Sequence, residues 1–315
     1  MTPQIPEFPH VVRIEPASAC NLACRHCPTG TVDMERGIMK PPVIERVMAE
    51  LEQVKNHVRV VVLYHGGEPF MNKRFLTLLA AVKQMGIAHV KTVSNGMLLK
   101  DHWIDGIIDG GLDAIEFSLD GTSAAMNDFI RRKSDFETVV ANIKRLIDRC
   151  IEKGAQAPTV AISQAQFIDP NAFDGQPCQP AAYIQEAFSG HYADHVTFKT
   201  TWAMQWPEMM LDRSLFGLFR DESVSDSAYC DQAINTMTIT ADGKVVGCCY
   251  DLTHRLILGD VMSERLPEIW QGKRAIALRE SIARKRYISI CQDCNTVRAP
   301  VYLVYKSKKG AIDNV

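Results

Sequence analysis

Three cysteines in one short loop constrain this chain more than any other feature. Cys20, Cys24 and Cys27 are separated by three and then two residues, and they follow a strand-like apolar segment, residues 11–15. Three thiolates can hold three of the four irons of a cubane cluster, which leaves the fourth iron open to a small ligand. Soft thiolates select iron–sulfur clusters or zinc, and structural zinc sites usually have four ligands. The loop therefore predicts an open iron–sulfur site, with a zinc knuckle or free buried thiols as the alternatives.

Strand-like and helix-like segments alternate over the first two thirds of the chain. The expected strands are residues 11–15, 58–64, 87–93, 114–119, 158–163 and 196–202, and the expected helices are residues 43–54, 75–85, 103–108 and 136–150. This alternation favours a parallel sheet with crossover helices. Six such units give an α/β fold, a partial (β/α)6 barrel open on one side. In such barrels the chemistry lies on the loops at the C-terminal ends of the strands.

The pattern changes after about Trp206. Residues 235–240 and 244–246 flank an Asp-Gly turn, which predicts a β-hairpin, and residues 266–282 have apolar positions at helical spacing. We therefore divide the chain into a partial barrel over residues 1–205 and a small α+β module over residues 206–315.

Motifs with the right chemistry for a cofactor lie at the ends of the next three expected strands. They are Gly66-Gly67-Glu68-Pro69, Ser94-Asn95-Gly96 and Ser118-Leu119-Asp120-Gly121, and Arg131 follows shortly after the last. Each motif alone is weak, since glycine turns end many strands. Together with the cysteine loop, in this order and spacing, they resemble the radical S-adenosylmethionine (SAM) enzymes. His26 stands where that family usually has an aromatic residue.

The resemblance assigns a role to each motif. Glu68 would receive the amino group of SAM, and the glycines Gly66 and Gly67 would let the backbone approach it closely. Ser118 would bind the ribose, and strand alternation places it on the barrel's inner face together with Glu116. Arg131 would meet the SAM carboxylate, with Arg132 as a competitor, and Ser94 and Asn95 would border the cofactor.

A second group of cysteines lies in the C-terminal module. Cys230, Cys248, Cys291 and Cys294 supply four thiolates, enough to hold a complete four-iron cluster without an open position. The arrangement resembles the Twitch module, a shortened form of the SPASM extension, because no cysteine follows Cys294. The implied cofactors are two 4Fe–4S clusters and SAM, and a structural zinc site is the alternative for the second group.

Three cysteines remain unassigned. If Cys248 is a ligand on a strand, alternation turns Cys249 away from the cluster, where its thiol could return a hydrogen atom to a substrate radical. Cys178, in the loop of residues 169–180 after the fifth expected strand, is the second candidate donor. Cys150 lies on an expected helix and is most simply a small packing residue.

The family resemblance implies reductive cleavage of SAM to a 5′-deoxyadenosyl radical, which takes a hydrogen atom from an unactivated carbon. We expect an epimerase of a sugar carbon, similar to radical SAM enzymes of aminoglycoside biosynthesis, with Cys249 as the catalytic hydrogen donor. A dehydrogenase of an aminocyclitol or sugar alcohol, with the auxiliary cluster as electron acceptor, is the first alternative. A peptide-modifying maturase is the second, which we disfavour because no leader-binding segment precedes the barrel.

A cationic aminoglycoside requires acidic and aromatic groups near the site. The candidates near expected strand ends or the second cysteine group are Glu15, Tyr64, Glu116, Asp169, Trp202 and Asp251. A reducing partner such as flavodoxin or ferredoxin would supply the electron for SAM cleavage.

Charge and cysteine content limit which binding partners and which cellular compartment we expect. The formal net charge is −2 with no long run of one sign, which argues against nucleic-acid or membrane partners. The N-terminal residues lack the pattern of a signal peptide, and ten cysteines in such a chain indicate metal or redox chemistry. We expect a cytoplasmic protein.

Overall fold

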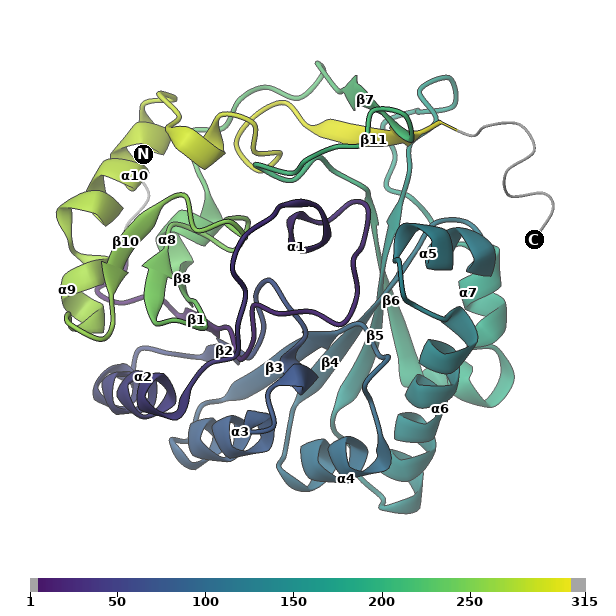
Figure 1. Cartoon of the computed structure of the whole chain (residues 1–315), viewed down its shortest axis with the longest axis horizontal. Coiled ribbons are helices and arrows are strands. Elements are labelled where there is room, and N and C mark those ends of the chain that lie inside the picture. The colour runs from purple at the N-terminus through teal and green to yellow at the C-terminus, as the bar shows by residue number, and fades with distance from the viewer. Residues whose placement is uncertain (1–4, 307–315) are drawn as a thin grey trace.

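The computed structural model describes residues 5–306 and shows an α/β fold with one large, mostly parallel sheet (Figure 1). Nine strands form this sheet in the order β10-β9-β8-β1-β2-β3-β4-β5-β6, and β7 and β11 form a separate pair. The predicted fold class is confirmed. The strands are β1 (Val11–Ile14), β2 (Val60–Val62), β3 (His89–Ser94), β4 (Ala114–Asp120), β5 (Thr159–Gln166), β6 (Val196–Trp202), β7 (Phe216–Arg220), β8 (Thr236–Ile239), β9 (Lys244–Val246), β10 (Ile257–Asp260) and β11 (Val301–Tyr305).

Helices cover the outer face of the curved sheet, and the cysteine loop with α1 lies inside the curve (Figure 1). The α-helices are α1 (Pro28–Thr31), α2 (Pro41–Val54), α3 (Phe75–Gln84), α4 (Asp101–Asp109), α5 (Ala124–Ile130), α6 (Phe136–Glu152), α7 (Ala182–Ala187), α8 (Asp231–Asn235), α9 (Leu266–Trp270) and α10 (Lys273–Ala283). Short 3-10 turns are η1 (Pro69–Met71), η2 (Gly190–His195) and η3 (Ser289–Cys291). In this part of the chain no helix combines the length and the apolar character that crossing a membrane requires.

The six barrel strands are parallel neighbours from β1 to β6, as the alternation predicted. Strand β4 shows why the sheet has one buried and one functional face. Ile115, Phe117 and Leu119 are fully buried toward the helices, whereas Glu116 and Ser118 are partly exposed on the inner side. The longest helix, α6, begins where the side chain of Asp135 accepts a 2.8 Å hydrogen bond from the amide of Thr138.

The C-terminal hairpin is confirmed, but it is not a separate sheet. Strands β8 and β9 are antiparallel across the Asp-Gly turn, and β8 pairs in parallel with β1, so the hairpin extends the barrel sheet by its first edge. Main-chain bonding thus joins the two proposed parts of the chain. The pairing is one that local sequence patterns do not reveal, because it joins residues more than 200 positions apart.

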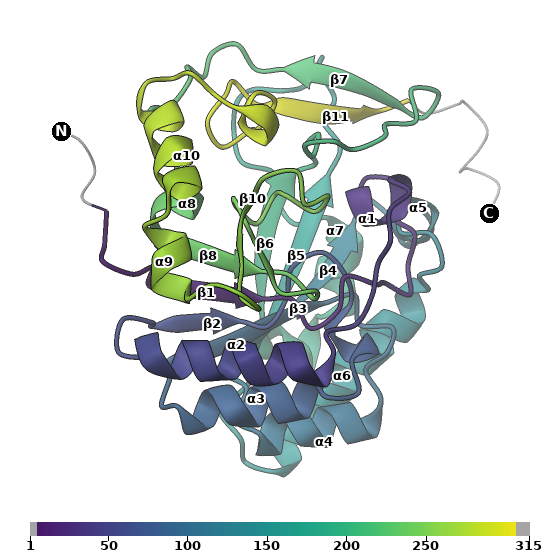
Figure 2. The same ribbon diagram turned by 60° about the vertical axis from the view of Figure 1, so that its left-hand side comes forward.

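The helix expected over residues 266–282 is two helices. Helix α9 ends at Trp270 and α10 begins at Lys273, with Gly272 between them. A continuous apolar face suggested one helix, but the amide of Gly272 bonds to the carbonyl of Ile269 and the chain turns there. The β7–β11 pair lies beyond the C-terminal ends of β5 and β6 (Figure 2), where Leu303 exchanges backbone hydrogen bonds with Ile168 and Ala203.

Candidate active site

The three cysteines of the first loop face one cavity of about 310 Å³ at the C-terminal ends of the barrel strands. Cys20, Cys24 and Cys27 all line it, and Cys27 immediately precedes α1. Burial raises the pKa of Cys20 to about 11 and that of Cys24 to about 12, and the neighbouring thiols add to both effects. Three crowded thiols in a buried cavity are a site that a cationic iron centre would stabilise as thiolates.

The glycine turn packs directly on the cysteine loop. A side chain at Gly67 would overlap the carbonyl oxygens of Ala17 and Ala19, so only glycine fits there. The amide of Glu68 donates to the carbonyl of Ala19 at 2.9 Å. The structure therefore places the predicted Gly66, Gly67 and Glu68 beside the cysteines, and all three line the cavity.

The carboxylate of Glu68 is fixed by the end of the next strand. Its Oε1 accepts from Oγ of Ser94 at 2.9 Å and its Oε2 from the amide of Asn95 at 2.8 Å. The side-chain amide of Asn95 donates to Oδ1 of Asn21, in the cysteine loop, at 2.8 Å. Burial raises the pKa of Glu68 to about 7 despite these donors. Ser94 and Asn95 thus border the cavity and also orient Glu68, a role that their sequence did not suggest.

Arg131, and not Arg132, reaches the cavity. Arg131 is buried and its Nη1 lies 2.6 Å from Oδ2 of Asp120, whereas Arg132 is exposed. Nε2 of His26 lies 3.3 Å from the same Asp120 oxygen. Burial alone would raise the pKa of Asp120, but Arg131 and His26 hold it well below its usual range. Ser118 lines the same side of the cavity.

Asp120 and His26 were not predicted as site residues. Asp120 was visible only as the third residue of the Ser-x-Asp-Gly motif, and His26 as an exception to the family pattern. The structure gives them a shared role, because together they position the buried guanidinium of Arg131 at the cavity.

Aromatic side chains form another part of the cavity wall. Tyr64, Trp202, Trp206 and Tyr250 line it, and the rings of Trp206 and Tyr250 lie 5.1 Å apart. Tyr64 and Trp202 were candidates from the sequence. Trp206 and Tyr250 were missed, because they come from the chain after β6 and from the turn after β9, far apart in sequence. The one available signal was the position of Tyr250, two residues after Cys248.

The expected acidic groups are not in the wall. Of the carboxylates proposed for a cationic substrate, Glu116 pairs with Lys91 and Lys199, and Asp251 is fully buried and accepts from the amides of Arg255 and Leu256. Glu15 is buried and bound to backbone amides, and Asp169 is exposed on a loop. The described carboxylates that do line the cavity are Glu68 and Asp120, which hold other groups.

Four cysteines of the C-terminal module converge as predicted. Cys230, Cys248, Cys291 and Cys294 line one small pocket whose remaining wall is mainly aliphatic, and each is at most 9% exposed. Tyr250 lines this pocket as well as the larger cavity. Burial raises the pKa of Cys248 and Cys291, and their cysteine neighbours raise it further. A mainly apolar pocket with four thiols fits a fully ligated cluster.

The thiols of the two cysteine groups are not packed at the spacing of a single zinc ion. Zinc–sulfur bonds of about 2.3 Å place the four sulfurs of a tetrahedral site about 3.8 Å apart. Over residues 5–306, the three-residue group whose His, Cys, Asp or Glu ligand atoms all lie within 4.8 Å of one another contains no cysteine. Among the described residues, no three thiols of either set therefore lie within 4.8 Å of one another.

The remaining cysteines do not line the cavity. Sγ of Cys249 lies 3.2 Å from Oε1 of Gln232, and burial raises the pKa of its thiol. The premise for its orientation was wrong, since β9 ends at Val246 and Cys249 lies in a turn. Cys178 is buried in its loop, and Cys150 packs against the main core from α6. A role for Cys249 or Cys178 as a hydrogen donor stays a prediction.

Two family models match separate parts of the chain. Residues 14–159 match the radical SAM superfamily, and residues 230–295 match the SPASM iron–sulfur cluster-binding domain. The GTP 3′,8-cyclase of Chlorobaculum tepidum is 30% identical over 142 residues, 43% of this chain and 40% of that protein. A tungsten-containing aldehyde ferredoxin oxidoreductase cofactor-modifying protein of Pyrococcus furiosus is 26% identical over 151 residues, 47% of this chain and 41% of that protein. The chain spans about two fifths of the length of these relatives.

Solved structures share the fold over nearly the whole chain. BtrN in complex with AdoMet and 2-DOIA aligns with a TM-score of 0.57 and 15% identity, covering 94% of both chains. The structure titled native anSMEcpe with bound AdoMet and Kp18Cys peptide aligns with a TM-score of 0.62 and 13% identity, covering 91% of this chain and 90% of the other. One of these titles names a small molecule and the other a peptide, so the shared fold does not choose between substrate classes.

Proposed function

We propose that this chain is a radical SAM dehydrogenase, since residues 14–159 match the radical SAM superfamily and residues 230–295 match the SPASM iron–sulfur cluster-binding domain. It would take a hydrogen atom from a hydroxyl-bearing carbon of a small molecule and pass the remaining electron to the auxiliary cluster. The observation that carries this proposal is the position of Tyr250, which lines both the cavity and the pocket of the four auxiliary cysteines. Tyr250 borders both sites, so a substrate radical held against Tyr250 in the cavity would lie on the side that faces the auxiliary cysteines.

The chain's own residues would bind and orient SAM. Glu68, held by Ser94 and Asn95, accepts from the amino group, and Arg131, held by Asp120, binds the carboxylate. Ser118 bonds to the ribose from the inner face of β4. When bound, SAM and the first cluster supply the 5′-deoxyadenosyl radical, given one electron from a reducing partner such as flavodoxin or ferredoxin.

The reaction balances with two one-electron steps. The radical removes hydrogen from the carbon of a secondary alcohol and leaves as 5′-deoxyadenosine. The alcohol then loses its hydroxyl proton and one electron, and the carbon–oxygen double bond of a ketone forms. The electron goes to the auxiliary site formed by Cys230, Cys248, Cys291 and Cys294.

The cavity wall favours a cyclic alcohol over a polycationic aminoglycoside. The described carboxylates in the wall, Glu68 and Asp120, already contact other protein groups. Aromatic surface is provided by Trp202, Trp206 and Tyr250. A ring with an apolar face packs well on such surface. A single amino group, as on an aminocyclitol, could still lie against an aromatic face through a cation–π contact.

The epimerase remains the second candidate function, in line with the sequence resemblance to the neomycin C epimerase. Two observations favour it: Cys249 directly follows a cluster ligand, and burial raises the pKa of its thiol, which keeps the S–H bond that a hydrogen donor needs. Against it, Cys249 does not line the cavity in the described chain.

Turnover of cyclitols and aminoglycosides in deuterated water, with reduced anaerobic enzyme, separates these functions. We expect one ketone per 5′-deoxyadenosine and no alcohol product in which solvent deuterium has entered at the attacked carbon. An inverted carbon carrying solvent deuterium, abolished in Cys249→Ala, would establish the epimerase instead. Modification of a peptide with no turnover of any small alcohol would refute both and favour a maturase.

A further inference from the structure

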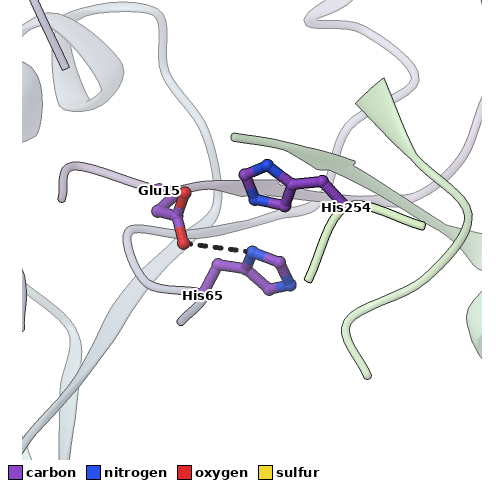
Figure 3. Close-up of side chains that lie close together, drawn as sticks. All are labelled: Glu15, His65 and His254. Atoms are coloured by element: carbon purple, nitrogen blue, oxygen red, sulfur yellow. Dashed lines mark ion pairs between the residues drawn. The ribbon is translucent and has the colours of Figure 1, made fainter. Parts of the chain in front are cut away.

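One cluster of metal-ligating side chains lies outside both cysteine sites. Glu15 follows β1, His65 precedes the Gly66-Gly67-Glu68 turn, and His254 lies in the loop after β9. One ligand atom from each residue lies within 4.8 Å of the other two. Figure 3 shows both imidazole rings beside the Glu15 carboxylate, His254 above and His65 below in this view, with the ion pair between Glu15 and His65 drawn as a dashed line.

The buried imidazole of His65 makes few polar contacts. Its side chain is 0% exposed, and neither Nδ1 nor Nε2 makes a hydrogen bond within the described residues. Nδ1 lies 3.2 Å from Oε1 of Glu15, an ion-pair contact when the imidazole is protonated, and Nε2 has no hydrogen-bond partner among the described residues. A buried polar atom without a partner is costly, and a metal ion at Nδ1 would remove that cost for one of the two nitrogens.

Glu15 is already held in the manner of a ligand carboxylate. Its Oε1 accepts from the amide of Gly66 at 2.9 Å, and its Oε2 accepts from the amide of Ala241 at 2.9 Å. Hydrogen bonds of this kind fix the orientation of metal-binding carboxylates.

The spacing also suits one ion. Zinc bonds to nitrogen and oxygen of about 2.1 Å place neighbouring ligand atoms about 3.4 Å apart. The 3.2 Å separation between Glu15 and His65 already has that size, and His254 completes a set of two imidazoles and one carboxylate. This ligand set suits divalent transition metals and differs from the all-thiolate sites elsewhere in the chain.

We propose that Glu15, His65 and His254 form a mononuclear site for a divalent transition-metal ion that joins the SAM-binding turn to the auxiliary module. The backbone supports such a junction. Ala241, in the β8–β9 turn, donates to Glu15, and Leu252 packs against Gly66 close enough that a side chain at that glycine would lie 3.3 Å from it. The ion would bind three segments that the chain brings together from positions 15, 65 and 254.

Zinc binding to the anaerobic holoenzyme tests the site. Protein carrying both clusters is freed of loose metal with a chelator, given one equivalent of Zn²⁺ and desalted, and its zinc and iron are measured by mass spectrometry. X-ray absorption at the zinc edge then identifies the ligands, since zinc–sulfur bonds of about 2.3 Å differ from zinc–nitrogen and zinc–oxygen bonds of about 2.1 Å. We expect one zinc per chain with nitrogen and oxygen ligands only, and unchanged iron.

Two variants and a control complete the test. His254→Ala and Glu15→Gln should each weaken zinc retention at least tenfold, while His102→Ala, at an exposed histidine on α4, should leave it unchanged. Wild-type holoenzyme that retains no zinc would overturn the proposal without any variant. Sulfur in the zinc shell, which indicates zinc in a vacated cysteine site, would overturn it as well, and so would full retention by His254→Ala with iron intact.

Discussion

The backbone amide of Asn95 donates a 2.8 Å hydrogen bond to Oε2 of Glu68, across the ends of two neighbouring strands. Ser94 binds the other carboxylate oxygen, and Asn95 also contacts the cysteine loop through Asn21. The glycine turn, the third strand and the first cysteine site therefore form one connected unit. A change to any of the three is expected to affect the other two.

Binding of SAM should depend on pH through Glu68. Its pKa is raised to about 7 in the SAM-free fold, so the carboxyl group is mostly protonated at pH 6 and mostly ionised at pH 8. The ionised form accepts hydrogen bonds from the amino group, so we expect the dissociation constant to fall about tenfold between these pH values. Equilibrium dialysis measures it. Glu68→Gln is the control, because the ionisable groups of SAM titrate alike with both proteins. If the dissociation constant changed with pH to the same extent in the wild type and in Glu68→Gln, the prediction would be contradicted.

Substitutions of the neighbouring residues Arg131 and Arg132 test the SAM site, with Arg132 as the control. Arg131→Lys removes the planar guanidinium that meets Asp120 and faces the cavity, so we expect SAM to bind at least tenfold more weakly. Arg132→Lys, at an exposed position, should leave SAM affinity within twofold of the wild-type value. Thermal unfolding of both variants checks that the Arg131 effect is not a loss of fold. Equal losses of affinity in the two variants would remove Arg131 from the SAM site.

Gly67 should be required for loading of the first cluster. In Gly67→Ala the new methyl group overlaps the carbonyls of Ala17 and Ala19 and displaces the cysteine loop. We expect iron per chain to fall from about eight to about four after anaerobic reconstitution, because a four-iron cluster at each of the two cysteine sites, as we propose for the wild type, amounts to about eight irons. Gly37→Ala is the control, since no atom lies within 4 Å of its added carbon. Full iron in Gly67→Ala would show that the close packing is not needed.

Loss of the auxiliary cysteine site should leave the cleavage of SAM intact. Cys294→Ala removes one of four ligands in the apolar pocket, and we expect about four irons per chain with uncoupled formation of 5′-deoxyadenosine still measurable by chromatography. Ketone formation should be lost, because the electron acceptor is gone. A variant that keeps eight irons, or one that forms ketone normally, is incompatible with the proposed electron path.

Local sequence patterns were sufficient for the barrel. The order and type of β1 to β6 and the inward position of Ser118 follow from alternation and from the rule that strand ends carry the chemistry. The grouping of the C-terminal cysteines came from the number of thiols and from the family resemblance. The pattern failed at residues 266–282, where an apolar face continues across the break at Gly272. It also failed at Cys249, which a turn and not a strand orients.

The sequence by itself determined the kind of fold and the cofactor chemistry, because hydrophobic period and thiol spacing are properties of short segments. The tertiary structure alone decided which groups meet. It paired β8 with β1, buried Arg131 against Asp120, and placed Tyr250 between the two cysteine sites. It also brought Glu15, His65 and His254 together. These contacts join residues that are from 11 to more than 200 positions apart, so they depend on packing of the whole chain and on burial that no local pattern encodes.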